Sequence, residues 1–257
     1  MKPNHHLKSR KLNKYLQIIF YLYTDYFLNV NYLGEVNIFM DEQAEYAKYY
    51  ENFSELELFP EHILRKIGKY FEPPILDVGC HTGKKARFYY DLGFKRISGC
   101  DISKNSVVIA KKSSPKSINF FQHDMVLGPT KTKFNTICSF QTIEHIFNYH
   151  FFLKNMYESL NTGGTLVIDT PNACSAITRA RLLLGDSRNF TGNIDESHIR
   201  FFNKPCLEKA IRQEGFEIVK SFGYNIRGIV KPFEILMPST LREVIVVIAK
   251  KVIINFC

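Results

Sequence analysis

Residues 75–93 read ILDVGCHTGKKARFYYDLG, an apolar strand followed by a glycine-bounded turn and a helix. An apolar run with Asp77 as its single charge predicts a strand that is buried on both faces of a sheet. Gly79 and Gly83 bound the turn, and glycine accepts positive φ and lets a ligand approach the main chain closely. The helix that follows directs its N-terminal N–H groups at that ligand. The segment therefore predicts a nucleotide-binding corner in a parallel α/β sheet.

Two other nucleotide-binding loops fit this turn poorly. A Walker loop has four residues between its glycines and then Lys-Ser/Thr, whereas here three residues separate the glycines and Lys84-Lys85 follows. That interpretation fails. The dinucleotide fingerprint G-x-G-x-x-G would place glycine where His81 and Lys84 stand, which weakens it without excluding it. The pattern that remains is Asp-x-Gly-x-x-x-Gly.

Polar residues follow the next predicted strands at the point where each strand ends. These strands lie at residues 95–101, 117–121, 134–140 and 165–170. The first ends in Asp101, where an acid can hydrogen-bond the hydroxyls of an adenosine ribose. Asp124 follows the second strand, and Gln141 opens the segment QTIEH after the third. Because the carboxyl ends of parallel strands share one edge, these side chains are expected at a common ligand-binding rim.

In order and spacing, these elements resemble the class I S-adenosylmethionine-dependent methyltransferases, with residues 75–93 similar to their motif I. Residues 73–222 resemble the subgroup that includes ubiquinone-type O-methyltransferases, and the likeness extends to TPN at 170–172 and HIRFFNKPCLEKAIRQEGFEIV at 198–219. The resemblance implies S-adenosylmethionine as the cofactor, with Asp124, the acid after the strand at 117–121, meeting the adenine amino group. The cofactor-binding residues it implies are Asp77, Gly79, Cys80, His81, Gly83, Asp101, Ile102, Asp124, Met125 and Gln141.

The end of the chain fits the same fold class. Residues 216–222 and 242–250 are predicted to form a sixth and a seventh strand, joined as a hairpin. We therefore expect a Rossmann-like α/β fold: a seven-stranded, mostly parallel sheet of order 3-2-1-4-5-7-6, with strand 7 antiparallel and helices on both faces. The connection 223–241 is long and contains Pro232 and Pro238, and in the resembling enzymes such an insertion often helps to form the acceptor site.

Methyl transfer makes modest chemical demands on a protein. The sulfonium methyl is already electrophilic, so the acceptor must mainly be held in line at about 3 Å with water excluded. A base is needed only when the acceptor is protonated, and His145, Glu144 and His198 are the titratable groups that this fold would bring near the sulfonium. We expect His145 to be the base, with His198 second. The alternative is that His145 only caps or packs the start of a helix.

A divalent metal is a second chemical alternative at the same place. Some resembling enzymes carry a Glu-x-x-Glu-His cluster here that helps to bind a metal ion against the acceptor oxygens. Gln141 stands at the first acidic position, and a neutral amide disfavours tight magnesium binding. We therefore expect no metal, with Glu144, His145 and His198 as partial ligands in the alternative.

The formal charge of +9 favours anionic partners but does not name the acceptor. The basic residues are spread along the chain, and no aromatic-basic RNA module stands out. We expect a small-molecule, lipid-linked or glycan acceptor methylated at oxygen. An RNA methyltransferase is the runner-up. A non-catalytic S-adenosylmethionine-binding protein is a third reading, because Cys80-His81 could crowd the methionine part of the cofactor.

Residues 1–39 stand apart from the predicted methyltransferase domain at 40–257. They are basic and then apolar, but the run from Leu16 to Tyr23 is too short to cross a bilayer, and no signal-peptide cleavage site is visible. They are either an interfacial helix at an anionic membrane or sequence upstream of a true start at Met40. The six cysteines lack a C-x-x-C pair, which favours reduced thiols, no zinc site and a cytoplasmic location, with peripheral membrane contact as an alternative.

Overall fold

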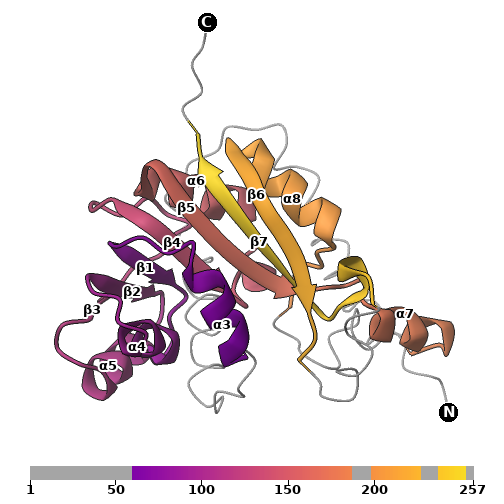
Figure 1. Cartoon of the computed structure of the whole chain (residues 1–257), viewed down its shortest axis with the longest axis horizontal. Coiled ribbons are helices and arrows are strands. Elements are labelled where there is room, and N and C mark those ends of the chain that lie inside the picture. Colours follow the sequence, from indigo (N-terminus) through magenta and orange to yellow (C-terminus); the bar gives the residue numbers. More distant parts are fainter. Residues whose placement is uncertain (1–59, 187–197, 227–236, 253–257) are drawn as a thin grey trace, which may run out of the picture. The chain divides into compact units, whose positions relative to one another are not determined.

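The computed structural model describes residues 60–186, 198–226 and 237–252. Within these ranges the apolar segments pair into one seven-stranded sheet of order β3-β2-β1-β4-β5-β7-β6 (Figure 1). The strands are β1 Ile75–Val78, β2 Ile97–Asp101, β3 Asn119–Gln122, β4 Phe134–Phe140, β5 Leu160–Pro171, β6 Phe216–Tyr224 and β7 Val244–Lys251.

The pairing directions confirm the predicted topology. β1 runs parallel to both β2 and β4, and all four of its residues are buried. β7 is antiparallel to β5 and β6, so the last two strands form the expected hairpin. The carboxyl ends of β1 to β5 therefore lie at one edge of the sheet, where the sequence places its acids.

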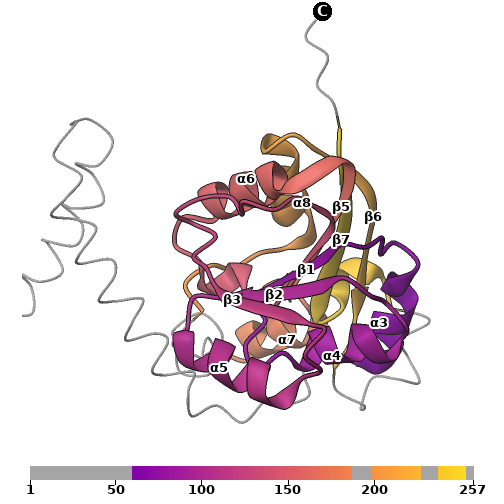
Figure 2. The same cartoon turned by 90° about the vertical axis from the view of Figure 1, so that its left-hand side faces the viewer.

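Helices cover both faces of the sheet. Figure 2 shows α6 and α8 on one side and α3, α4 and α5 on the other, while α7 lies beyond the carboxyl end of β5 (Figure 1). The α-helices are α3 Glu61–Gly68, α4 Lys84–Asp91, α5 Lys104–Ser113, α6 Tyr149–Ser159, α7 Ala176–Leu183 and α8 Lys204–Gln213, and the 3-10 turns are η1 Ile143–His145 and η3 Ser239–Leu241.

Two apolar cores hold these layers together. One contains Ile67 of α3 and Tyr89 of α4 against one face of the sheet. The other contains Leu153 of α6 and Leu207 of α8 against the opposite face. Because both faces are closely packed, the carboxyl edge is the part of the sheet that can accept a ligand.

The predicted element boundaries differ from the structure around β5. We expected the helix to run to about Leu160 and residues 161–164 to cap it, but α6 ends at Ser159 and β5 already begins at Leu160. The Leu160 side chain is fully buried, and its backbone pairs with Phe134. Burial of this side chain therefore favours a strand conformation at Leu160. A register shift between Phe134 and Thr136 absorbs the extra residues.

Several expectations lie outside the described residues. These are the extension at 1–39, the start at Met40 and the part of the β6–β7 connection at 227–236. Among the described helices, none combines the length and the apolar character that crossing a bilayer requires. The thiols of Cys80, Cys100, Cys138, Cys174 and Cys206 are free, as predicted.

Close packing around Gly99 of β2 leaves no room for a side chain at this position. A Cβ at this position would lie 2.7 Å from the ring of Phe120 and 3.0 Å from the Cβ of Cys80, and both neighbours are buried. Gly99→Ala should therefore lower the free energy of unfolding by about 1–3 kcal/mol, measured by urea denaturation. Gly128→Ala is the control, because a Cβ there meets nothing within 4 Å. Equal stability of the two variants would contradict this account of the packing.

Candidate functional site

The turn after β1 is fastened to the end of β2. Gly79 and Gly83 have φ of 73° and 78°, and His81 takes a left-handed φ of 46° although it has a side chain. The His81 N–H donates to Oδ2 of Asp101 at 2.8 Å, and the Cys80 N–H donates to the Cys100 carbonyl at 3.0 Å. These bonds offset the cost of the left-handed residue, so the turn is held in one shape.

Asp101 organises this corner through both carboxylate oxygens. Oδ1 accepts from the Ser103 N–H at 2.9 Å, while Oδ2 accepts from His81. Burial raises the pKa of Asp101, and the two N–H donors partly oppose that effect. Each oxygen keeps accepting capacity for a hydroxyl group presented from outside. Ile102 follows directly and is half-buried.

Asp124 carries a buried oxygen that lacks a hydrogen-bond partner among the described residues. Its Oδ1 accepts from the Val126 N–H at 2.8 Å, whereas Oδ2 is shielded and accepts from no group in that part of the chain. Such an acceptor is costly unless a ligand supplies a donor. The side chain of Met125 lies in the core instead, and its carbonyl accepts from Nδ2 of Asn155 at 2.8 Å.

The turn after β1 touches the segment after β4 directly. A Cβ on Gly79 would lie 2.5 Å from Oγ1 of Thr142, so only glycine fits there. Thr142 in turn donates to the Phe140 carbonyl at 3.1 Å. Asp77, on β1, is buried just behind this contact. The predicted cofactor corner and the QTIEH segment are therefore parts of one site.

The QTIEH segment is held by the carboxyl end of β5. The Gln141 backbone N–H and its Nε2 both donate to Oδ1 of Asp169, at 2.8 and 2.9 Å. Oγ1 of Thr170 donates to Oε2 of Glu144 at 3.0 Å. Oε1 of Glu144 is buried and has no hydrogen-bond partner among the described residues. Gln141 thus faces β5, and Glu144 keeps one oxygen for another group.

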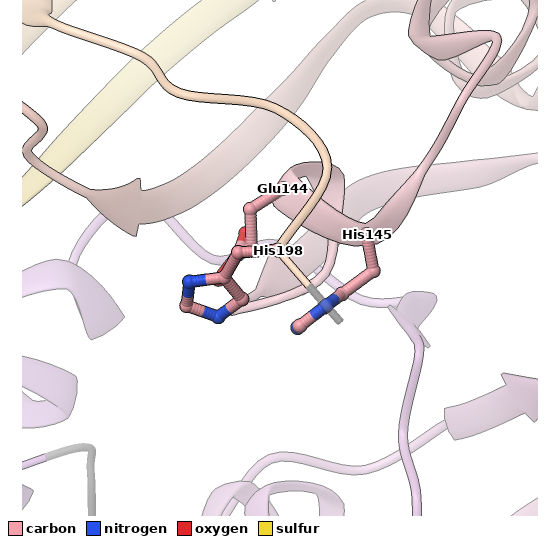
Figure 3. A group of neighbouring side chains, drawn as sticks. All are labelled: Glu144, His145 and His198. Atoms are coloured by element: carbon pink, nitrogen blue, oxygen red, sulfur yellow. The ribbon is translucent and has the colours of Figure 1, made fainter. Parts of the chain in front are cut away.

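The three predicted catalytic side chains come together, as Figure 3 shows. Glu144, His145 and His198 each offer one ligand atom, and these atoms lie within 4.8 Å of one another. The rings of His145 and His198 have centroids 4.7 Å apart. His198 is brought in because the N–H groups of Ile199 and Arg200 donate to the Glu144 carbonyl at 3.0 and 2.9 Å.

Burial sets the protonation of the two acids at this edge. Burial, together with the negative charge of Asp169, raises the pKa of Glu144 to about 8, although a backbone N–H and the Thr170 hydroxyl oppose the shift by hydrogen bonding to the carboxylate. Burial likewise raises the pKa of Asp169 to about 6, opposed chiefly by the hydrogen bond from Gln141 and the charge of Lys85. Near pH 7, Glu144 is therefore mostly protonated and Asp169 mostly ionised.

Sequence reasoning missed Thr142, Asp169, Thr170 and Tyr224. The Tyr224 hydroxyl, at the end of β6, donates to Oδ2 of Asp169 at 3.0 Å. Asp169 had a usable signal, because it is the single charged residue in the apolar run TLVIDT, just as Asp77 is in ILDV. Tyr224 and the two threonines had no comparable signal, since their roles depend on contacts between distant strands.

A surface cavity is lined largely by residues that follow His198 in the sequence. Its volume is about 340 Å³, and four of its lining residues directly follow His198 in the sequence. Nearby, Phe147 is 52% exposed, and the Arg200 guanidinium lies over its ring at 4.8 Å and donates to its carbonyl. The residues that line the cavity are Tyr149, Ile199, Arg200, Phe201, Phe202 and Cys206.

Comparisons with known proteins agree with the fold. The sequence profile of a family described as a methyltransferase domain matches residues 41–221. Among solved structures, an S-adenosylmethionine-dependent methyltransferase from Archaeoglobus fulgidus superposes with a TM-score of 0.59 at 21% identity, covering 80% of this chain and 99% of that one. At this identity the likeness establishes the shared fold.

Curated relatives match over shorter stretches. The mitochondrial ubiquinone biosynthesis O-methyltransferase of Dictyostelium discoideum is 25% identical over 112 residues, 38% of this chain and 35% of the relative. A probable S-adenosylmethionine-dependent methyltransferase of Mycolicibacterium smegmatis is 23% identical over 149 residues, 58% of this chain and 54% of the relative. The chain therefore spans about a third to a half of these two proteins.

The raised pKa of Glu144 predicts a pH-dependent cost to stability. The unfolded glutamate loses its proton near its ordinary pKa of 4.5, and the folded one near 8, so stability falls as the pH rises between these values. Glu144→Gln removes the titrating group. Its unfolding free energy relative to the parent should rise on the order of 1–3 kcal/mol between pH 5.5 and 8.5, measured by urea denaturation.

The exposed Glu217 of β6 provides the control for this measurement, as Glu217→Gln. It should keep a constant difference from the parent across the same pH range. A constant difference for Glu144→Gln as well would show that Glu144 is not buried in the way described.

Proposed function

The chain belongs to a family of S-adenosylmethionine-dependent methyltransferases, and from that premise we propose that it methylates an oxygen of a small-molecule, lipid-linked or glycan acceptor. S-adenosylmethionine is the cofactor of this family. The observation that carries the proposal is the convergence of Glu144, His145 and His198 at the carboxyl edge, beside the glycine turn. A base there can remove a hydroxyl proton as the methyl group is transferred.

The residues at the edge fit the cofactor. Asp101 would accept from the ribose hydroxyls, and the shielded Oδ2 of Asp124 would accept from the adenine amino group. Gly79 and Gly83 leave the backbone open beside Cys80 and His81, and Asp77 lies behind them. Ile102 borders the ribose position. Met125 and Gln141 would contribute backbone only, because their side chains are engaged in the core and with Asp169.

We assign the base to His145, with His198 as the alternative. An imidazole can act as a general base, so the His145 ring would take the acceptor's hydroxyl proton. The sulfonium methyl then moves to the oxygen, leaving S-adenosylhomocysteine and a protonated imidazole. Glu144 lies behind the two rings with one oxygen held by Thr170, and its carbonyl holds the segment that follows His198. These contacts keep the base in place for in-line transfer.

The acceptor class is supported by the aromatic cavity next to His198. Tyr149, Phe201 and Phe202 line it, which suits an apolar or aromatic part of an acceptor, while Arg200 supplies a cation at its rim. The Dictyostelium relative is a ubiquinone biosynthesis O-methyltransferase, which agrees with methylation at oxygen. We further propose that residues 40–257 form the methyltransferase domain of a cytoplasmic protein and that residues 1–39 provide any peripheral membrane contact.

A divalent metal is a second way for the same residues to act. The donor set of one carboxylate and two imidazoles within 4.8 Å fits a transition ion such as Mn²⁺ or Zn²⁺ better than Mg²⁺. Gln141 does not add a donor, since its amide is bound to Asp169. When bound, the ion would lower the pKa of an acceptor hydroxyl. Full activity after exhaustive chelation would exclude this alternative, and loss with recovery on adding Mn²⁺ would establish it.

Substituting Asp101 tests the cofactor assignment. Asp101→Ala removes the carboxylate that is proposed to bind the ribose, so the dissociation constant of S-adenosylhomocysteine should rise roughly 10- to 100-fold by calorimetry. Asp91→Ala, an exposed acid at the end of α4, is the control and should bind as the parent does. Unchanged affinity in Asp101→Ala would remove the ribose assignment.

Substituting the two histidines tests the chemical step. Four acceptor probes are incubated with the protein and labelled S-adenosylmethionine: 3,4-dihydroxybenzoate, a hydroxylated prenyl phenol, a glycan and a short RNA. On the accepted probe, His145→Ala should lower kcat about 100- to 10,000-fold while S-adenosylhomocysteine binding is retained. His198→Ala should have the smaller effect, and the exposed His62 of α3 gives the control variant His62→Ala.

The probe set also separates the competing functions. Methylation of RNA alone, with a steep salt dependence of RNA binding, would replace the proposed acceptor class by nucleic acid. Cofactor binding without transfer to any probe would favour a non-catalytic protein.

A further inference from the structure

We propose that Asp169, at the carboxyl end of β5, is the positioning residue of this site: it holds the left-handed turn at Gln141 and so fixes the segment that presents Glu144 and His145. The inference rests on the proposed function, since it assigns a task to Asp169 within that reaction. Asp169 acts through Gln141, which donates to it from both its backbone N–H and its side-chain amide.

The first support is the set of donors that meet on this carboxylate. The side chain is fully buried, and it accepts from the backbone N–H of Gln141, from its Nε2 and from the Tyr224 hydroxyl, at 2.8, 2.9 and 3.0 Å. These donors come from the ends of β4 and β6, which flank β5 and its partner β7 in the sheet. A carboxylate without such donors would be costly at this depth. Asp169 therefore joins the ends of three strands at a single point.

The second support is the backbone of Gln141. Its φ is 52°, in the left-handed region that glutamine rarely occupies. Both of its N–H donors point to the same oxygen of Asp169, so the turn is stabilised by charge-assisted bonds rather than by residue type. Without the carboxylate, the local preference of glutamine opposes the observed turn. The course of the chain into η1 thus depends on Asp169.

The third support is the short path from this turn to the cluster. Two residues separate Gln141 from Glu144, and one of them, Ile143, is fully buried. Thr170, the residue after Asp169, holds Oε2 of Glu144. Consecutive residues of β5 therefore hold the beginning and the middle of the same segment. A shift of the turn would be passed on to Glu144 and to His145 beside it, because little slack exists between the two anchors.

The test compares two substitutions that differ in hydrogen bonding. Asp169→Leu removes all acceptors. Asp169→Asn can still accept both Gln141 donors on its amide oxygen while its amide N–H donates to the Tyr224 oxygen. For each variant of the full chain, calorimetry gives the affinity for S-adenosylhomocysteine, and NMR gives the ring Hε1 signals of His145 and His198 in that complex. The signals are assigned with the His145→Ala and His198→Ala variants.

Asp169→Leu should still bind S-adenosylhomocysteine, within about tenfold of the parent, because Asp101 and Asp124 lie at or beyond the ends of other strands and Gln141 is assigned only a backbone contact with the cofactor. Its two histidine signals should move or broaden, and kcat on the accepted probe should fall about 10- to 100-fold with little change in KM. Asp169→Asn should restore signals and kcat toward the parent. Thr165→Val, a buried position in the middle of β5 and four residues before Asp169, is the matched control and should leave all readouts unchanged.

Two results would overturn the proposal: histidine signals in Asp169→Leu that match the parent, or an Asp169→Asn variant as impaired as Asp169→Leu. If Asp169→Leu does not fold, Gln141→Asn replaces it. Asparagine tolerates the left-handed turn but is too short to place its amide on Asp169, so the ring signals should still move. Failure of the proposed function would look different, since no probe would then be methylated while the histidine signals still responded to Asp169→Leu.

Discussion

The pairing of β1 with parallel strands on both sides is the constraint on which the site depends. Each residue of β1 is buried, and helices cover both faces of the sheet. A ligand can therefore reach the strands only at their carboxyl edge. The chain places Asp77, Asp101 and Asp124 on or beyond successive strand ends at that edge. The position of the site follows from the sheet, and its chemistry follows from the residues that end the strands.

Because the strand ends meet at one edge, several buried acids lie there. The cost of burying each carboxylate must be offset by hydrogen-bond donors or a positive charge beside it. Asp101 is balanced by two backbone N–H groups, and Asp169 by Gln141, Tyr224 and the nearby charge of Lys85. At Glu144 burial and the negative charge of Asp169 outweigh the hydrogen bonds to the carboxylate, so its pKa is raised more than that of Asp169. Neighbouring carboxyl groups in different protonation states allow one edge to hold both a fixed anion and a protonated acid.

Local patterns in the sequence were sufficient for the sheet and for the convergence of the predicted side chains. The spacing of apolar residues, the turn residues and the single acids within apolar runs predict where each strand ends. The parallel topology then brings Glu144 and His145 to the same edge of the sheet as Asp101. The contacts that hold the segment after β4 could not be predicted in this way. No glycine marks the left-handed turn at Gln141, and the bonds to Glu144 come from residues 199 and 200, far along the chain.

Gln141 and Asp169 together explain how this chain departs from the Glu-x-x-Glu-His pattern that it resembles. The amide at the first position removes a negative charge from the cluster of Glu144, His145 and His198, and the carboxylate on the adjacent strand binds that amide instead. The acid at this corner thus stands on the neighbouring strand β5 and accepts from Gln141 and Tyr224. A cluster that is less negative holds a hard cation weakly, which favours the proposal that an imidazole acts as a base over the proposal that a metal ion activates the acceptor hydroxyl.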